Sequence, residues 1–300
     1  MKRLLYAIIV IVVIVIAVSE GFIQYALKPQ LKENQSIEWV DSVIKCGALK
    51  DTFLISKDSG CKMHAWYLRA DSTTNKVAVV VHGYTDNALL MGKYAEIYDK
   101  QLHYNIIMPD LHYHGQSDGK YVQMGWRDRL DVIQWCAFAD SLFNVGNHVT
   151  MQVLHGVSMG AATVMSVSGE ELPEYIKCFV EDCGYTSVWD EFTNELHNQF
   201  SLPPFPLLYT TSWLNKIQNG WSFTEASPLN QVAKCKRPML FIHGGDDDFV
   251  NTDMVYQLYK VKPNPKQIHV FKGAMHARSL HDNIDEYTKL VTAFVNKYNK

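Results

Sequence analysis

Ser158 stands between two glycines, Gly156 and Gly160, at the end of a short apolar run. The pattern Gly-x-Ser-x-Gly is typical of a sharp turn from a strand into a helix, where a Cβ at either glycine would collide with neighbouring chain. Such a turn exposes the serine hydroxyl in a cleft and places the N–H of Met159 where it favours an oxyanion. The spacing predicts Ser158 as a nucleophile and Met159 as an oxyanion donor; a glycine-rich corner that serves packing alone is the alternative.

A serine hydroxyl becomes a good nucleophile when an imidazole removes its proton and a carboxylate holds that imidazole in place. Two later segments supply these groups in the order that the serine motif predicts, acid before base. Three consecutive aspartates, residues 246–248, follow one apolar run, and His276 follows the next. Because chemistry gathers where the strands of a parallel sheet end, we predict His276 as the base and one of the aspartates as the acid.

The chain contains 12 histidines, so position has to separate a catalytic one from the others. We predict a structural role for His82, which follows an apolar run and would shape a turn that offers the backbone N–H of Tyr84 as a second oxyanion donor. His112, His114 and His155 have no comparable predicted role.

Apolar runs that alternate with helical patterns predict a mainly parallel sheet built from strand–helix–strand units. Two β-rich runs flank a polar turn early in the chain and predict an antiparallel hairpin at residues 52–56 and 63–69. The further predicted strands are residues 76–81, 105–108, 149–154, 177–182, 239–243 and 267–272. The predicted helices are residues 89–101, 126–143, 161–167, 253–260 and 285–297.

The segment at about residues 185–232 is rich in aromatic residues and prolines. Connections of this length in compact domains are usually lids or binding structures. We therefore predict a lid here, with a helical excursion that serves stability alone as the alternative.

The N-terminal segment, residues 1–27, is predicted to direct the protein to a membrane. Residues 4–18 form an apolar run of fifteen after Lys2 and Arg3. A helix of that length rises only about 22 Å against a hydrocarbon core of roughly 30 Å, which is typical of a signal peptide. The apolar character resumes at residues 22–27, however, so an uncleaved anchor is predicted beside it. A buried core element is the third interpretation.

The charges at the N-terminus predict where the rest of the chain lies. Because Lys2 and Arg3 precede the apolar run, the catalytic domain is predicted outside the cytoplasm. It would stay at the cell membrane, or be secreted or periplasmic after cleavage near Ser19, where residues 17 and 19 are both small.

Composition excludes several classes of protein. The formal net charge is −3 and no basic cluster occurs, so a nucleic-acid partner is not expected. Six cysteines are present without a Cys-x-x-Cys pair, and we expect no zinc, other metal or cofactor. Cys46 and Cys61 lie near two early predicted strands and could form a disulfide or remain separate thiols.

Five motifs in order resemble the α/β-hydrolase superfamily: His82-Gly83-Tyr84, Asp110 to Ser117, Gly156 to Gly160, Gly244 to Val250, and Gly273 to His276. Within it the chain is similar, over residues 50–298, to bacterial serine hydrolases related to prolyl-oligopeptidase-like and serine-aminopeptidase-like esterases. The resemblance implies an α/β-hydrolase fold: a mostly parallel central sheet with helices on both faces and a helical lid insertion, within a domain at residues 50–300.

The resemblance also implies roles for individual residues. They are Ser158 as nucleophile, Asp247 as acid, His276 as base, and the N–H groups of Tyr84 and Met159 as the oxyanion hole. The usual spacing to Val250 favours Asp247 over Asp246 and Asp248.

These motifs predict a serine hydrolase that cleaves the ester bond of a small acyl substrate through an acyl-serine intermediate. The alternative within the fold is an aminopeptidase or dipeptidyl-peptidase-like enzyme, which usually carries acidic lid residues for a substrate ammonium. Glu191 and Glu195 are the candidates for that role. A transacylase and a non-catalytic binding module complete the alternatives, and the module is disfavoured because no member of the predicted triad is replaced.

Overall fold

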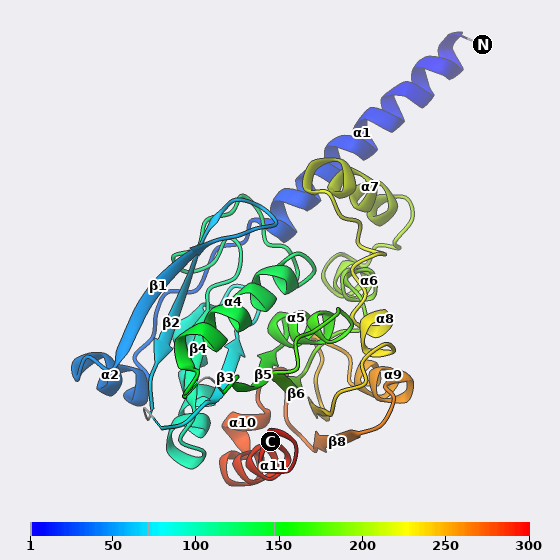
Figure 1. Ribbon diagram of the computed structural model, residues 1–300. Helices are drawn as coiled ribbons and strands as arrows, with labels where there is room; N and C mark the ends of the chain where they lie inside the picture. The colour runs from blue at the N-terminus through cyan, green and yellow to red at the C-terminus, as the bar shows by residue number, and fades with distance from the viewer. Residues whose placement is uncertain (1, 71–72, 147) are drawn as a thin grey trace.

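The computed structural model describes residues 2–70, 73–146 and 148–300 (Figure 1). The described residues form one eight-stranded sheet in the order β1-β2-β4-β3-β5-β6-β7-β8. Strand β2 pairs antiparallel with β1 and β4, and the other pairs are parallel. The strands are β1 (Leu49–Ile55), β2 (Lys62–Leu68), β3 (Lys76–Val81), β4 (Asn105–Pro109), β5 (Met151–Val157), β6 (Ile176–Asp182), β7 (Met239–Gly244) and β8 (Lys266–Phe271).

Helices cover both faces of the sheet, which explains why its central strands are almost continuously apolar. In β3, Ala78 and Val80 belong to one buried cluster, whereas Val79 and Val81 belong to the cluster on the opposite face. The first face is covered by α2 (Glu38–Lys45), α3 (Gly92–Glu96) and α11 (Ile284–Tyr298). The second is covered by α4 (Asp128–Phe143), α5 (Met159–Ser168) and α9 (Asp253–Val261). The predicted α/β-hydrolase architecture is confirmed.

The helix predicted at residues 89–101 consists of three different pieces. Helix α3 is flanked by a 3-10 turn, Ala88–Met91, and by a π-helical turn, Ile97–Gln101. The side chain of Asn87 caps the first turn by accepting hydrogen bonds from the N–H groups of Leu89 and Leu90. A further short helix, α10 (Ser279–Asp282), precedes α11.

A helical insertion lies between β6 and β7, as expected for the lid, and covers one end of the sheet (Figure 1). Two of its helices begin with serine caps: the Ser187 hydroxyl accepts from the Asp190 N–H, and the Ser227 hydroxyl accepts from the Asn230 N–H. The insertion consists of α6 (Val188–Phe200), α7 (Leu207–Asn219) and α8 (Pro228–Val232).

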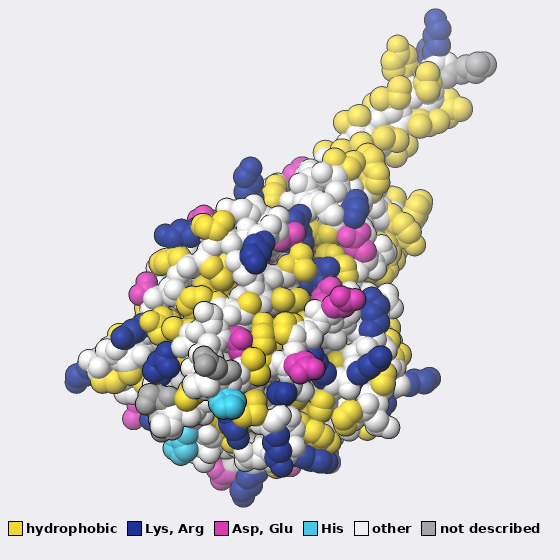
Figure 2. All heavy atoms as spheres, viewed as in Figure 1, with side chains coloured by type: hydrophobic (Ala, Val, Ile, Leu, Met, Phe, Trp, Pro, Cys, Tyr) yellow, Lys and Arg dark blue, Asp and Glu magenta, His cyan; other side chains and the backbone are white. Residues whose placement is uncertain are grey.

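The N-terminal segment is one continuous helix, α1 (Lys2–Leu27), with two different environments. Its first part projects from the molecule beside α7 and is covered with exposed hydrophobic side chains (Figures 1 and 2). From Ser19 onward it enters the fold, where Ile23 and Leu27 are fully buried in the cluster that contains the lid. A domain boundary at residue 27 stays a prediction, but the last turns of α1 are part of the core.

The cysteines are all free. Cys46 is exposed at the end of α2 and Cys61 is half-buried before β2. Of the two arrangements considered from the sequence, the structure has the separate thiols and not the disulfide.

Candidate active site

Ser158 occupies a strained corner between β5 and α5. Its backbone angles, φ 56° and ψ −119°, are unfavourable for a residue with a side chain. A Cβ on Gly156 would lie 2.1 Å from the carbonyl oxygen of Gly160, and a Cβ on Gly160 would lie 2.1 Å from that of Val81. The two glycines therefore let β3, β5 and α5 approach closely, which is the packing that the Gly-x-Ser-x-Gly spacing predicts.

The structure brings Ser158, His276 and Asp247 together in one line of hydrogen bonds. The Nε2 atom of His276 lies 2.9 Å from the Ser158 hydroxyl oxygen, and its Nδ1 atom lies 2.8 Å from an oxygen of Asp247. Asp247 follows β7 and His276 follows β8, so adjacent parallel strands deliver both groups to the end of the sheet where β5 presents the serine. These distances permit proton transfer from the serine to the imidazole.

Burial and hydrogen bonds distinguish Asp247 from its neighbours. Its Oδ1 accepts from the N–H groups of Phe249 and Val250, at 3.1 and 2.9 Å, while Oδ2 faces His276. Asp246 and Asp248 are exposed, and neither hydrogen-bonds His276 within the described part of the chain. Asp247 is thus the aspartate placed to orient the imidazole.

A second histidine, His243, contacts Asp247. Its Nε2 lies 3.3 Å from Oδ2 of Asp247 and donates to the carbonyl oxygen of Val250 at 2.9 Å. Burial raises the pKa of Asp247, but hydrogen bonds and charge from His243 and His276 outweigh it and lower that pKa to about 2. Sequence reasoning did not identify His243, because a histidine inside an apolar strand is indistinguishable from any other buried one.

Two backbone N–H groups are free beside the serine. Met159 opens α5 and Tyr84 follows β3, and neither N–H has a hydrogen-bond partner among the residues described. His82 holds the β3 turn, since its Nδ1 donates to the carbonyl oxygen of Gly83 and its Nε2 accepts from the N–H of Leu111. The oxyanion hole formed by these two N–H groups stays a prediction.

The other histidines near the site are part of buried structural networks. His112 lies 2.7 Å from a carboxylate oxygen of Asp131. Burial, followed by the charge of His82, lowers the pKa of His114 to about 3. Burial also lowers the pKa of His155 to about 3, so it stays neutral between two tyrosine hydroxyls.

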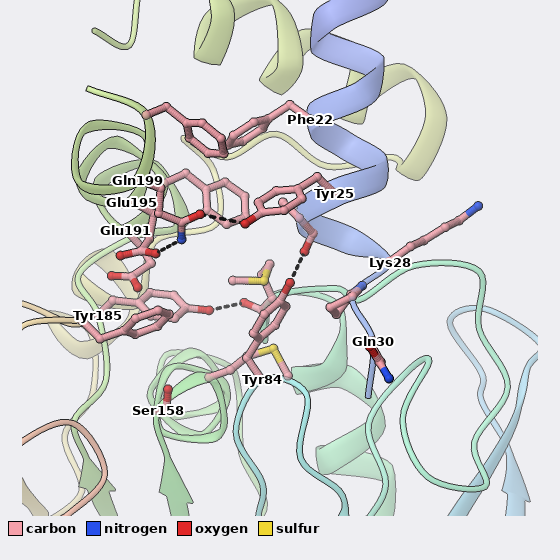
Figure 3. Close-up of a pocket in the computed structure, with 17 residues that line it drawn as sticks. Phe22, Tyr25, Lys28, Gln30, Tyr84, Ser158, Tyr185, Glu191, Glu195 and Gln199 are labelled. Carbon is pink, nitrogen blue, oxygen red and sulfur yellow. Dashed lines mark hydrogen bonds between the residues drawn. The ribbon is translucent and has the colours of Figure 1, made fainter. Parts of the chain in front are cut away.

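A cavity of about 400 Å³ opens above Ser158 (Figure 3). Its size lies in the range of about 300–1,000 Å³ that is typical of small-molecule sites. Lid helix α6 forms one wall and the end of α1 forms another, with Phe22 and Tyr25 pointing into the space between them (Figure 3). The hydroxyl of Tyr25 donates to Gln199 at 2.8 Å and joins the two walls.

The role of α1 in this wall was not predicted. The sequence pointed to the apolar residues at 22–27, but their pattern also suits a membrane segment. Only the packing of the end of α1 against the lid shows that these residues line the cavity.

Two carboxyl groups, those of Glu191 and Glu195, also line the cavity. Glu191 is 3% exposed, and its Oε2 has no hydrogen-bond partner in the described residues. Burial, followed by the charge of Glu195, raises the pKa of Glu191 well above its usual range. The cavity therefore combines apolar walls with a carboxyl group that favours its neutral form.

One group within the described ranges has the spacing to hold a metal ion. Ligand atoms of Cys183, Asp247 and His276 lie within 4.8 Å of one another. Burial raises the pKa of the Cys183 thiol well above its usual range, which disfavours the thiolate that a metal would need. Both ring nitrogens of His276 are engaged by Asp247 and Ser158, so this set suits proton transfer better than metal binding.

The sheet order and the corner at Ser158 are those of an α/β-hydrolase. The chain belongs to the prolyl oligopeptidase family, whose model matches residues 112–300. It is a serine hydrolase of the α/β-hydrolase kind. The matched region contains Ser158, Asp247 and His276, whereas Tyr84 lies before it.

Relatives with known sequences or structures extend the comparison. The chain is 29% identical over 250 residues to the uncharacterized protein YqkD of Bacillus subtilis (strain 168), covering 83% of this chain and 80% of that protein. The esterase Pf2001 of Pyrococcus furiosus has the same fold, with a TM-score of 0.69, 22% identity, and coverage of 91% and 97% of the two chains. An acylaminoacyl peptidase of Pyrococcus horikoshii matches with a TM-score of 0.61 and 17% identity, over 90% of this chain and 45% of that one.

Proposed function

We propose that this protein hydrolyses carboxylic esters through an acyl intermediate on Ser158. The observation that carries the proposal is the line from Asp247 through His276 to Ser158, with hydrogen bonds of 2.8 and 2.9 Å, beneath a cavity of substrate size. In the first step Nε2 of His276 takes the proton from Ser158 as its oxygen attacks the carbonyl carbon. The N–H groups of Tyr84 and Met159 hold the resulting oxyanion.

The tetrahedral intermediate then collapses and the ester's C–O bond breaks. The leaving alkoxide takes the proton from His276 and departs as an alcohol, which leaves the acyl group on Ser158. A water molecule gives its proton to His276 and attacks the acyl carbon, and the acid is released as the proton returns to Ser158. Asp247 stays ionised throughout and stabilises the imidazolium.

Apolar walls support an acyl ester as the substrate. Phe22, Phe192, Phe200 and Phe249 line the cavity above Ser158 and could contact a hydrocarbon chain. The full-length protein in detergent micelles should cleave a series of p-nitrophenyl esters faster than aminoacyl anilides. A preference for the anilides at equal concentration would contradict ester hydrolysis as the main activity.

Glu191 and Glu195 favour a second candidate function, a peptidase for substrates with a free amino terminus. A substrate ammonium placed beside these carboxyl groups would stabilise their ionised forms. If this is the function, Glu195→Gln should raise the KM for aminoacyl anilides and leave acyl esters unaffected. Equal effects on the two substrate classes would argue against an ammonium site.

We also propose that α1 keeps the protein at the cell membrane with the catalytic domain outside the cytoplasm. Over its whole length of 26 residues, helix α1 is long and apolar enough to cross a membrane by length and composition, and it fits either a signal anchor or a signal peptide. The packing of residues 19–27 in the core supports retention of this helix, since the same helix that would enter the membrane also completes the cavity wall. The alternative is a released protein cleaved near Ser19.

A further inference from the structure

An exposed apolar stripe runs along lid helix α7. Phe205, Tyr209, Trp213 and Ile217 follow one another at intervals of four residues, so they share one side of the helix and the turn before it. Their exposed fractions are 71%, 55%, 59% and 62%. Large side chains that gather on one exposed face mark an interaction site more often than a solvated surface.

Helix α7, which carries the stripe, lies beside the point where α1 leaves the domain. Helix α1 packs against α7 there: the Ser19 hydroxyl donates to the carbonyl oxygen of Leu207, and Gln218 donates to the Glu20 carboxylate at 2.6 Å. Figure 2 shows hydrophobic side chains along the projecting helix and again at the edge of the domain next to its base. Exposed apolar surface is therefore present both on the projecting helix and on the neighbouring lid.

The length of the projecting part of α1 determines how close the domain, with its stripe, would lie to a membrane that α1 enters. Its apolar run, residues 4–18, rises only about 22 Å, roughly 8 Å less than the hydrocarbon core of a bilayer. Ser19 is already buried in the domain, so the helix cannot lengthen without drawing the domain against the membrane. Because α7 packs beside α1 at this point, its exposed stripe would then lie close to the interfacial region, where tryptophan and tyrosine are favoured.

The cavity above Ser158 shares a wall with α1. Phe200 lines the cavity, is 47% exposed, and stacks edge-on against Tyr25 of α1 with ring centroids 5.9 Å apart. Leu202, also exposed, follows it and leads to Phe205. Exposed apolar residues thus occur along the chain between the cavity wall and the start of the stripe.

We propose that the α7 stripe rests on the lipid bilayer that α1 enters, and that the cavity takes the acyl chain of a single-chain ester amphiphile directly from that bilayer. This inference rests on the proposed ester hydrolysis and names its substrate class. A bound substrate would leave the bilayer with its acyl chain beside Tyr25 and Phe200 and its ester carbonyl at Ser158. The headgroup is joined to that carbonyl, so it would lie next to Ser158 as well.

Vesicle assays of the full-length protein test the substrate class. The protein is reconstituted into vesicles of phosphatidylcholine and phosphatidylglycerol that contain monooleoylglycerol, and p-nitrophenyl butyrate is the water-soluble reference. We expect the wild type to release oleate from the vesicles and to cleave the butyrate. Cleavage of butyrate without oleate release would overturn this inference alone, whereas failure on both substrates, with no fluorophosphonate labelling of Ser158, would overturn the proposed hydrolysis.

A double variant, Phe205→Glu with Trp213→Glu, tests the surface itself. It should lower oleate release by about tenfold or more, because charge is disfavoured in the interface, and leave butyrate cleavage unchanged. The matched control is Tyr256→Glu on α9, where a tyrosine of similar exposure (52%) lies away from α1, and it should change neither rate. Unchanged oleate release in the double variant would sink the proposal.

A measurement independent of activity covers the case in which the double variant fails to fold. Lipids with brominated chains should quench the fluorescence of the wild type in vesicles, and Trp213→Phe should remove part of that quenching. If Trp213→Phe leaves the quenching unchanged, the stripe does not contact lipid. Burial of the stripe between two copies of the chain would give that same result and would also overturn the proposal.

Discussion

The hydroxyl of Ser158 is the group on which every proposed step depends. Because an activated serine reacts rapidly with fluorophosphonates, the wild type should be labelled and Ser158→Ala should not. The substitution removes one oxygen atom that borders the cavity and leaves the backbone corner unchanged, so the thermal unfolding midpoint should stay near that of the wild type. Labelling that persists in Ser158→Ala, mapped by peptide mass, would assign the nucleophile elsewhere.

Three consecutive aspartates allow a test of the acid within one loop. Asp247→Asn should lower kcat by about 10⁴-fold, since an amide holds the imidazole in the wrong tautomer. Asp246→Asn and Asp248→Asn are matched controls on exposed neighbours and should cost far less. Steady-state kinetics on p-nitrophenyl butyrate measures all three, and a larger loss at either control would move the acid.

Glu191 makes a prediction about pH. Its pKa is raised in the folded protein, so the folded state holds the proton more tightly than the unfolded state does. That contribution to stability is complete below the unfolded value near 4.5 and is lost as the pH rises through the folded value. Glu191→Gln cannot ionise and does not lose this contribution. Its Tm minus that of the wild type should therefore rise by roughly 2–4 °C when the pH is raised from 5 to 8.

Calorimetry at the two pH values measures this difference. Glu195→Gln, a change at a half-buried neighbour in the same helix, provides the control and should shift less. A difference in Tm that does not change with pH would show that the buried carboxyl group carries no such proton linkage.

At the scale of elements, α1 is the helix whose two ends lie in different environments. Leu27 at its end is fully buried in the core, whereas Leu5 near its start is 59% exposed. Leu27→Ala should lower the free energy of unfolding by about 2–5 kcal/mol, because it leaves a cavity beside the lid. Leu5→Ala should leave it unchanged.

Chemical denaturation in detergent micelles compares the two variants. If Leu27→Ala proves as stable as Leu5→Ala, the end of α1 does not belong to the core, and its place in the cavity wall would be lost with it. The two variants thus test whether the end of α1 is part of the folded domain or α1 only tethers the domain.

At the scale of the whole molecule, location is the property to test. Lys2 and Arg3 stand at the outer end of α1, and the proposed topology keeps them in the cytoplasm with the domain on the other side. Membrane fractions should contain the intact chain, and protease added outside spheroplasts should digest the domain. A soluble mature chain that begins at Glu20 would rule out the anchor, and protection of the domain from protease would overturn the topology.

Local patterns were enough to predict the architecture and most of the site. The glycine spacing around Ser158 predicts the corner, and the alternation of apolar strands with helices predicts the parallel sheet. Both can be read from the sequence because each pattern is formed by residues that are close together in the chain. The order of serine, aspartate and histidine along the chain likewise predicted which residues the strands would bring to one end of the sheet. The roles of these residues stay predictions until the variants are measured.

The tertiary structure alone decided the features that depend on contacts between distant segments. Only folding places His243 beneath Asp247, buries Glu191 in the cavity wall and sets Tyr25 of α1 against Phe200 of the lid. No local pattern encodes these contacts, because an apolar residue in α1 suits a lipid and a protein core equally well. The packing of α1 against the lid makes that choice for the residues after Ser19, which line the cavity, while the residues before Ser19 stay exposed and form the proposed membrane segment.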